Sequence, residues 1–221
     1  MANPIKYSVK KELLALTLLF FVIILSFVAY PSLSDKIASH WNFAGQVDGW
    51  SKKSSFIYLF PGLIIFMYGF MTIMPFIDPK KQNYSEFKQT YTNFKALLVG
   101  VLSAVYTIII FSNLGYNINI GQSVSFLIGG MMIVIGTMLR NIKSNWFIGI
   151  RTPWTMSSPI VWEKTHQRSV YFFTIMGLSI IITPYFSSPW NIIIFSLGIL
   201  QMIAGTVIYS YFIYQKEKKI K

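Results

Sequence analysis

Two histidines occur in the 221 residues, and each lies in a short stretch that also holds tryptophan, glycine and a carboxylate. His40 belongs to SHWNFAGQVDGW and precedes Asp48 by eight residues. His166 belongs to NWFIGIRTPWTMSSPIVWEKTHQRS and follows Glu163 by three residues. Imidazole and carboxylate groups serve in acid–base catalysis and in metal binding. These two stretches are therefore the places in the sequence to look for chemistry.

Neither stretch has enough suitable groups for a metal centre or a catalytic site. His40 and Asp48 would supply two metal ligands, whereas zinc sites need more. The spacing Glu163-x-x-His166 is that of an iron-binding motif in helical bundles, but such sites need a second copy of it. Two candidate groups in each stretch are also few for catalysis. We therefore expect a protein that is not an enzyme and that holds no metal or cofactor.

The elements that must position these stretches are long and apolar. The chain is 54% hydrophobic and only 12% charged, and six segments without Asp, Glu, Lys, Arg or His approach the ~20 residues that a membrane-spanning helix needs. The sequence thus predicts an all-α integral membrane protein with six transmembrane helices. The predicted segments are Leu13–Tyr30, Phe56–Ile77, Ala96–Leu114, Val124–Leu139, Val170–Phe186 and Ile192–Tyr214. The fourth segment is the shortest, and we expect its helix to include Gln122 or Ser123.

Basic residues are distributed unevenly among the connecting segments. Of the 19 Lys and Arg residues, 16 lie before the first segment, in alternate loops and in the tail, and three lie in the other loops. By the positive-inside rule, both termini are cytoplasmic. This orientation and contact with anionic lipid headgroups account for the net charge of +12, so we expect no direct binding of nucleic acid. The absence of cysteine excludes disulfides and thiol chemistry.

The predicted topology places the two stretches on opposite sides of the membrane. SHWNFAGQVDGW lies in the outer loop 31–55, and the longer stretch lies in the inner loop 140–169. The chain is divided into two halves of three helices, residues 1–123 and 124–221. In each half the first helix is followed by a loop with a tryptophan, a glycine and a second tryptophan. This echo would suit a 3+3 inverted repeat of the kind found in transporters.

Local patterns predict the structure of the outer loop. Leu33, Ile37 and Trp41 recur every four residues after Ser32, a good capping residue, which predicts a short amphipathic helix. The segment NFAGQVDGW contains two glycines in turn-forming contexts. We expect it to form a compact turn or small hairpin after the helix.

Two further helices are predicted on the inner side. Ser158 followed by proline predicts a helix start, and that helix would continue into the fifth segment with Trp162 and His166 on one face. We expect Arg151 to pair with Glu163 or to bind a lipid phosphate.

The inner loop 78–95 carries four aromatic residues at helical spacing, namely Tyr84, Phe87, Tyr91 and Phe94. The pattern predicts an amphipathic helix on the inner membrane surface, without a protein partner.

Both stretches resemble the SdpI family of bacterial immunity proteins. SHWNFAGQVDGW looks like the motif of the N-terminal domain of unknown function that is common in that family. NWFIGIRTPWTMSSPIVWEKTHQRS is similar to the family's second signature. The resemblance implies a multi-pass protein in the plasma membrane of a Gram-positive bacterium, which protects the cell against a secreted peptide toxin of the SdpC kind. It further implies that the toxin-occupied protein holds a cytoplasmic transcriptional repressor at the membrane.

Topology and resemblance together assign candidate sites. We expect the outer loop to face the toxin, and the inner motif to contact the repressor or to brace the bundle. The candidate outer residues are His40, Trp41, Asn42, Gly45, Asp48, Gly49 and Trp50. The candidate inner residues are Asn145, Gly149, Arg151, Thr152, Pro153, Trp154, Thr155, Trp162, Glu163 and His166. The alternative is a transporter or channel for a peptide or lipid, against which we count the lack of ionisable groups in the six segments.

Overall fold

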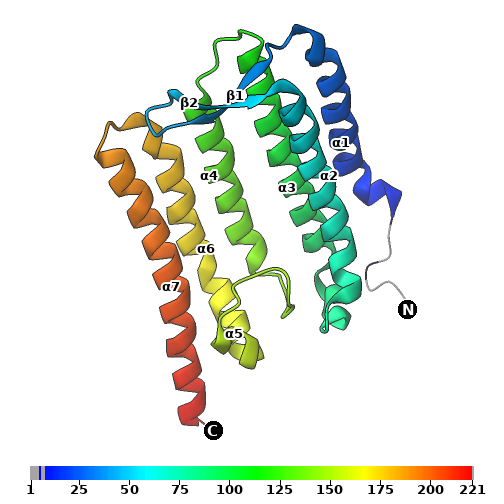
Figure 1. Ribbon diagram of the computed structural model, residues 1–221. Helices are drawn as coiled ribbons and strands as arrows, with labels where there is room; N and C mark the ends of the chain where they lie inside the picture. Colours follow the sequence, from blue (N-terminus) through cyan, green and yellow to red (C-terminus); the bar gives the residue numbers. More distant parts are fainter. Residues whose placement is uncertain (1–4, 6–7, 221) are drawn as a thin grey trace.

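The computed structural model describes Ile5 and residues 8–220 of the chain. It is a bundle of long helices with a small β hairpin at one end (Figure 1). The long helices are α1 (Val9–Ala29), α2 (Lys53–Ile77), α3 (Tyr84–Asn113), α4 (Ile120–Leu139), α6 (Pro159–Ile182) and α7 (Trp190–Ile220). The short elements are η1 (Tyr30–Ser32), β1 (Lys36–Trp41), β2 (Val47–Lys52), η2 (Lys81–Asn83), α5 (Pro153–Ser157) and η3 (Thr183–Tyr185). The predicted all-α membrane class is confirmed. Lys6 and Lys221, two of the basic residues counted above, lie outside the described residues.

Five helices of the described chain are long and apolar enough to cross a membrane, namely α1, α2, α3, α4 and α7. The remaining long helix, α6, runs beside α4 and α7 in the bundle (Figure 1). It carries Glu163, Lys164 and Arg168 in its first turns, so only its later part, from Val170 to Ile182, is continuously free of charge. Its composition therefore differs from that of the other five.

The first three long helices pack around a buried cluster that includes Tyr106 of α3. Tyr106 has no exposed surface, and its ring stacks on Phe56 of α2 at a centroid distance of 5.9 Å. Its hydroxyl lies 2.6 Å from the hydroxyl of Ser26 in α1. Ile37 of β1 is also fully buried in this cluster. The hairpin is thus anchored to the same core that joins α1, α2 and α3.

The other long helices pack closely because glycines face each other. A Cβ at Gly129 of α4 would lie 2.5 Å from the carbonyl oxygen of Gly177 in α6, and a Cβ at Gly177 would lie equally close to the carbonyl oxygen of Gly129. Small residues let helix backbones approach closely in a membrane. α4 includes Gln122, as its short apolar segment requires, and the Asn119 side chain caps the helix by accepting from the Gln122 N–H at 3.1 Å.

The short helix expected before the first turn-forming glycine is wrong, because this segment is strand β1. Leu33 and Ile37 are buried and Trp41 is partly buried, so the apolar positions are as predicted. A spacing of four residues keeps side chains on one face of a strand as well as of a helix, since a strand repeats every two residues. The expected hairpin does form, with β1 and β2 antiparallel and irregular in register near His40.

The surface helix expected in the loop 78–95 is also wrong. Its residues belong to α3, which is kinked at Phe87 and continues into the bundle. Tyr84, Phe87 and Tyr91 are buried with at most 3% of their surface exposed, and they pack against one another. The aromatic face was predicted correctly, but it is covered by protein, including Trp162 of α6.

Candidate functional site

The two predicted stretches lie at opposite ends of the bundle (Figure 1). The hairpin, residues 36–52, forms one end. The motif loop, residues 140–158, forms the other end between α4 and α6 and contains α5. The two groups of candidate residues are therefore not brought together into one site.

The hairpin organises its polar residues locally. Asn42 accepts the N–H groups of Ala44 at 2.9 Å and Gln46 at 3.0 Å, which closes the turn, and Gly45 has a φ of +76° that favours glycine. His40 Nδ1 lies 2.5 Å from a carboxylate oxygen of Asp48, and both side chains are exposed. The predicted neighbours thus meet, but as a hydrogen-bonded pair at the surface. Within the described residues no group of three potential metal ligands occurs.

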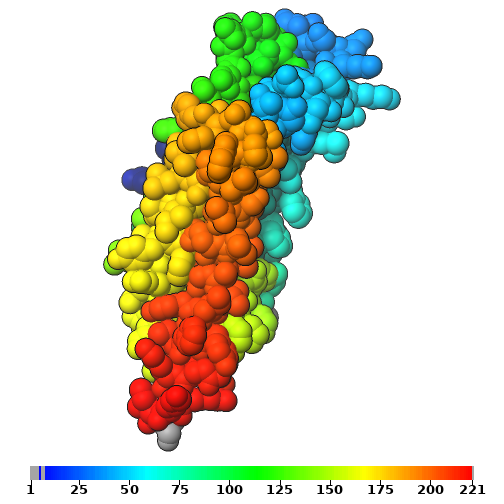
Figure 2. Space-filling view, turned by 90° about the vertical axis from the view of Figure 1, so that its left-hand side faces the viewer, coloured from blue at the N-terminus to red at the C-terminus, as the bar shows by residue number. Residues whose placement is uncertain are grey.

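The aromatic residues of the hairpin differ in exposure. Trp41 is partly buried against the core of the first three helices, whereas Trp50 has 61% of its surface exposed. Phe43 at the turn contacts the ring of Phe195 in α7 edge-on at 5.6 Å, so the hairpin bridges the bundle to the start of α7 (Figure 2). Gly49 lies opposite His40, and a Cβ there would come within 2.8 Å of the His40 Cβ. Trp50 is therefore the tryptophan of the hairpin that is free to meet a partner.

The motif loop is built around Asn145, which has no exposed surface. The side-chain oxygen of Asn145, Oδ1, accepts the N–H groups of Phe147 at 2.9 Å and Ile148 at 2.7 Å. Its amide nitrogen donates to the carbonyl groups of Lys143 and Ile148, each at 2.9 Å. One buried side chain thus satisfies four backbone groups, which identifies Asn145 as the organiser of this loop.

His166 and Gly149 form the next layer of the loop. His166 Nδ1 lies 2.7 Å from the carbonyl oxygen of Trp162, and the N–H of Ile150 donates to His166 Nε2 at 2.9 Å. These partners require a neutral ring with its proton on Nδ1. Burial lowers the pKa of His166 to about 4, which agrees with the neutral form. Gly149 has a φ of +118°, and a Cβ there would lie 2.5 Å from His166 Nε2.

Trp162 completes this layer. Its ring stacks on the His166 ring with a centroid distance of 4.1 Å, and its Nε1–H donates to the Ile142 carbonyl at 2.8 Å. Both ring nitrogens of His166 are thus hydrogen-bonded inside the protein, so they are not available for acid–base catalysis or metal binding. The Trp162 indole nitrogen is hydrogen-bonded as well.

Hydroxyl and tryptophan side chains join the loop to α7. Thr152 and Thr155 form a capping box at the start of α5, and the Thr152 hydroxyl lies 3.0 Å from that of Ser210. Pro153 occupies the first turn of α5, where its missing N–H costs nothing. Trp154 contacts the ring of Tyr211 edge-on at 5.1 Å.

α6 begins at Pro159, as predicted, with Ser158 as its cap. The Ser158 hydroxyl also donates to the Glu217 carboxylate of α7 at 2.5 Å.

The loop is joined to the first half of the chain through Asp78, which is 2% exposed. Its carboxylate accepts the N–H of Trp146 at 2.9 Å, the hydroxyl of Tyr84 at 2.9 Å and the N–H of Lys80 at 2.7 Å. Asn83 donates to the carbonyl of Ser144 at 2.7 Å. The motif loop therefore bridges the two halves at this end of the bundle.

Two charged residues of the loop do not pair as expected. Arg151 donates to the carbonyl group of Trp146, and Glu163 accepts from the Gln167 amide at 3.1 Å. Both charged side chains are exposed. The predicted Arg151–Glu163 pair is therefore wrong, because each residue finds a partner nearer in the chain. These two residues and Trp146, 51% exposed, are among the side chains of this region that are open to a partner.

Two family models match the chain in the regions just described. Residues 17–65, which contain the hairpin, match a domain of unknown function, DUF1648. Residues 141–211, which contain the motif loop, match the SdpI/YfhL protein family. In both regions the chain resembles the SdpI-type family. It is 23% identical to the immunity protein SdpI of Bacillus subtilis (strain 168) over 94% of this chain and 97% of that protein. No solved structure matches.

The family matches and the apolar helices together identify a multi-pass bacterial membrane protein that is similar to an immunity protein. The SdpI-type family is a family of immunity proteins and not a known enzyme family.

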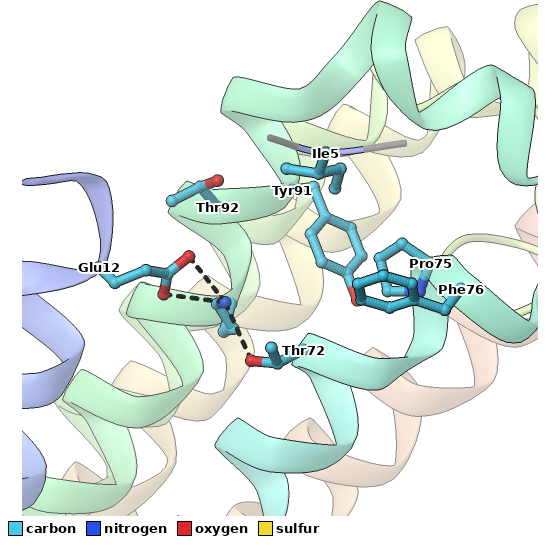
Figure 3. Close-up of a pocket in the computed structure, with 8 residues that line it drawn as sticks. Ile5, Glu12, Thr72, Pro75, Phe76, Tyr91 and Thr92 are labelled. Atoms are coloured by element: carbon cyan, nitrogen blue, oxygen red, sulfur yellow. Dashed lines mark hydrogen bonds and ion pairs between the residues drawn. The ribbon is translucent and has the colours of Figure 1, made fainter. Parts of the chain in front are cut away.

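The structure adds a feature that sequence reasoning missed. Glu12 of α1 and Lys95 of α3 are 5% and 3% exposed, and Lys95 Nζ lies 2.9 and 2.8 Å from the two carboxylate oxygens. Lys95 also donates to the hydroxyl of Thr72 at 3.2 Å, and Tyr68 donates to Glu12 at 3.2 Å. The pair lines a pocket of about 170 Å³ together with Tyr91 and neighbouring apolar residues (Figure 3).

The pair escaped detection because each charge lies one residue before a predicted apolar segment. Leu13 and Ala96 begin those segments, but the helices begin earlier, at Val9 and Tyr84. A charge at the end of an apolar run is ordinarily assigned to the membrane surface. The informative signal is that Glu12 is an acidic residue directly after two lysines at an end where basic residues prevail.

Proposed function

We propose that this chain is an immunity protein that protects its host cell against a secreted peptide toxin, which it meets at the hairpin. The immunity class comes from the family. The observation that carries the location is the exposure of the hairpin, where Trp50 is 61% and Phe43 51% exposed. His40 and Asp48 add an exposed polar pair beside them. An aromatic and polar surface of this kind is typical of recognition sites for peptides.

The proposal includes six crossings of the membrane, with α6 as the sixth. α6 packs against both α4 and α7 along the bundle (Figure 1), which supports a common membrane position. Its charged first turns lie at the motif-loop end, where many other cations gather. These are Lys80, Lys81, Arg140, Lys143, Arg151 and Lys216. The positive-inside rule then makes this end cytoplasmic and the hairpin end external.

On the cytoplasmic side, we propose that Trp146, Arg151 and Glu163 contact a transcriptional repressor, while nearby lysines meet anionic lipid headgroups. These side chains are among the exposed members of the motif. The buried members, led by Asn145, would hold them in place. The halves 1–123 and 124–221 are the units of this arrangement, and their inverted-repeat relation stays a prediction.

A pair of tryptophan variants tests toxin recognition. Trp50 and Trp190 are 61% and 60% exposed and both lie at the hairpin end, so each would serve equally as an interfacial anchor. In a toxin-sensitive strain exposed to a peptide toxin of the SdpC kind, Trp50→Ala should reduce protection about tenfold, and Trp190→Ala should have little effect. Equal effects of the two variants would assign Trp50 to the membrane interface. If the unaltered protein gives no protection, the proposed function is wrong.

Single-cysteine variants test the topology, because the native chain contains no cysteine. Ala44→Cys in the hairpin turn should react with an impermeant maleimide in intact cells. Ser157→Cys at the end of α5 should react only after permeabilisation. Both positions are exposed. The reverse labelling pattern would invert the proposed orientation.

A transporter or channel for a peptide or lipid is the second candidate, and the buried Glu12–Lys95 pair favours it. Ionisable residues inside membrane bundles commonly mark transport pathways. The double variant Glu12→Leu/Lys95→Met should keep the fold, since replacing both partners avoids an unpaired charge. In reconstituted vesicles a transporter would show flux of a labelled peptide or lipid that this double variant lacks. Absence of flux in the unaltered protein under every gradient would exclude this candidate.

A further inference from the structure

The two outer edges of the hairpin have different surroundings. On the β1 edge, the side chain of Asn113 in α3 accepts the N–H of Ala38 at 2.8 Å and donates to the carbonyl of Ala38 at 3.1 Å. This amide occupies the place that a neighbouring strand would take. The β1 edge is therefore closed.

The β2 edge is open. Trp50 lies directly opposite Ala38 in the antiparallel register. Because the backbone groups of Ala38 point away from β2, those of Trp50 must point away from β1, as in every non-hydrogen-bonded pair of such a ladder. No partner for the N–H or carbonyl of Trp50 is found among the described residues. An exposed strand edge with unpaired groups is a template for another strand.

A shallow groove of about 220 Å³ adjoins this strand. It is lined by Ser51 of β2 and by residues of the first turns of α2, namely Ser55, Phe56, Leu59, Phe60 and Leu63. Since neighbouring residues of a strand point to opposite faces, an added strand would direct alternate side chains toward this groove. Apolar side chains fit the groove, because most of its lining is aromatic or aliphatic.

Charge adds a second feature to the edge. Lys36 and Lys52 lie opposite each other in the register, and both are exposed. Like charges placed directly opposite destabilise a strand pair. A carboxylate on a bound chain would relieve this repulsion.

We propose that the open edge of β2 binds an extended peptide as a third strand of the hairpin sheet. Trp50 supplies the main-chain hydrogen bonds, the groove takes an apolar side chain, and Lys52 meets a carboxylate of the peptide. Main-chain groups at strand spacing fit an extended polypeptide and not a lipid. This inference rests on the proposed function, since the peptide is then the secreted toxin.

The first test separates the N–H of Trp50 from its indole. Trp50→Ala removes only the indole ring. Trp50→Pro removes the ring and also the outward N–H, and an edge strand tolerates proline at a position whose N–H points away from its neighbour. A synthetic toxin of the SdpC kind would be titrated against full-length protein in lipid nanodiscs. The Kd of Trp50→Pro should exceed that of Trp50→Ala about tenfold. Equal Kd values in two variants with unchanged thermal unfolding would overturn strand addition.

A second test leaves the protein unaltered. The same peptide is made with N-methyl groups at alternate backbone positions, in two sets that differ by one residue. In strand addition one set should lose binding about tenfold and the other set should not, because an edge strand bonds every second residue. Equal binding of both sets would overturn the proposal.

Two further variants test the groove and the charge. Ser55→Trp, which fills the groove, and Lys52→Glu should each weaken binding of the unmodified peptide about fivefold. If neither variant changes the Kd, the peptide does not lie along this edge.

The outcomes distinguish the inference from the proposed function. If the unaltered protein neither binds the toxin nor protects cells, the proposed function fails and this inference fails with it. If the protein binds and protects but Trp50→Pro behaves as Trp50→Ala, immunity stands and strand addition is wrong. A dimer that Trp50→Pro dissociates, together with unchanged toxin binding, would assign the edge to a second copy of this chain and overturn the proposal.

Discussion

The hairpin and the motif loop are made from similar residues and use them in opposite ways. Each contains an asparagine that accepts two backbone N–H groups, a glycine with positive φ and tryptophan, and each has a histidine, which for the motif loop is His166 of the adjoining α6. In the hairpin these side chains are mostly exposed, whereas Asn145 and His166 are buried and their side-chain nitrogen and oxygen atoms are hydrogen-bonded. The two regions therefore differ in whether water can reach their side-chain hydrogen bonds.

This comparison separates recognition from bracing. An exposed polar group exchanges one partner for water at little cost, whereas a buried group that loses its partner leaves another group unsatisfied. The motif loop is thus suited to hold the halves of the bundle together. The hairpin is suited to change partners. The residues shared by the two regions allow the comparison to be tested pair by pair.

The asparagines should give the largest contrast. Asn145→Ala removes four hydrogen bonds from a fully buried site and should lower the free energy of unfolding by about 3 kcal/mol or abolish folding. Asn42→Ala removes two backbone contacts from an exposed turn and should cost less than about 1 kcal/mol. Thermal unfolding of both purified variants in one detergent provides the measurement. Similar costs would show that the motif loop is not the rigid region.

The glycines with positive φ should differ next. Gly149→Ala combines an unfavourable φ with a Cβ at 2.5 Å from the His166 ring, so we expect a loss of about 2 kcal/mol or more. At Gly45 nothing lies within 4 Å, and Gly45→Ala should cost about 1 kcal/mol from backbone strain alone. The same unfolding measurement applies. A Gly45→Ala cost at or above that of Gly149→Ala would contradict the packing argument.

The buried histidine predicts a pH dependence that an exposed one does not. The pKa of His166 is lowered from 6.5 to about 4, so the folded protein binds its proton less readily than the unfolded chain. This contribution to stability is present above pH 6.5 and declines as the pH falls toward 4, with a loss of about 2 kcal/mol at pH 5. His166→Phe should be less stable at pH 7 and should lose this part of the slope. An unchanged slope would mean that His166 is not the group responsible.

Much of the fold is readable from the sequence because membrane insertion depends on long apolar runs. The shortness of Val124–Leu139 led to the correct extension of α4, and Ser158–Pro159 marked the start of α6. The type of secondary structure was predicted wrongly where periodicity is ambiguous. The series Leu33, Ile37 and Trp41 is the example, because its spacing suits a strand as well as a helix. Spacing shows which residues share a face and does not show what that face packs against.

The same limit applies to the candidate sites. The sequence identified the two stretches and the His40–Asp48 and Trp162–His166 neighbours. It missed Asp78, which accepts three hydrogen bonds at the end of α2, one of them from Trp146 of the motif loop, because one carboxylate in an inner loop has no distinctive local pattern. It also missed the pairing of Glu12 with Lys95, 83 residues apart. Such pairs depend on tertiary packing, which single-sequence patterns do not contain.

The exposed His40–Asp48 pair of the hairpin should give the smallest effect on stability. His40 and Asp48 side chains are 72% and 43% exposed, so water and salt screen their attraction. Asp48→Asn should change the free energy of unfolding by less than about 0.5 kcal/mol, and added salt should abolish the difference. Its effect on toxin protection should exceed its effect on stability if the hairpin is the recognition surface. A large loss of stability in Asp48→Asn would show that the hairpin, like the motif loop, depends on its polar pairs for its fold.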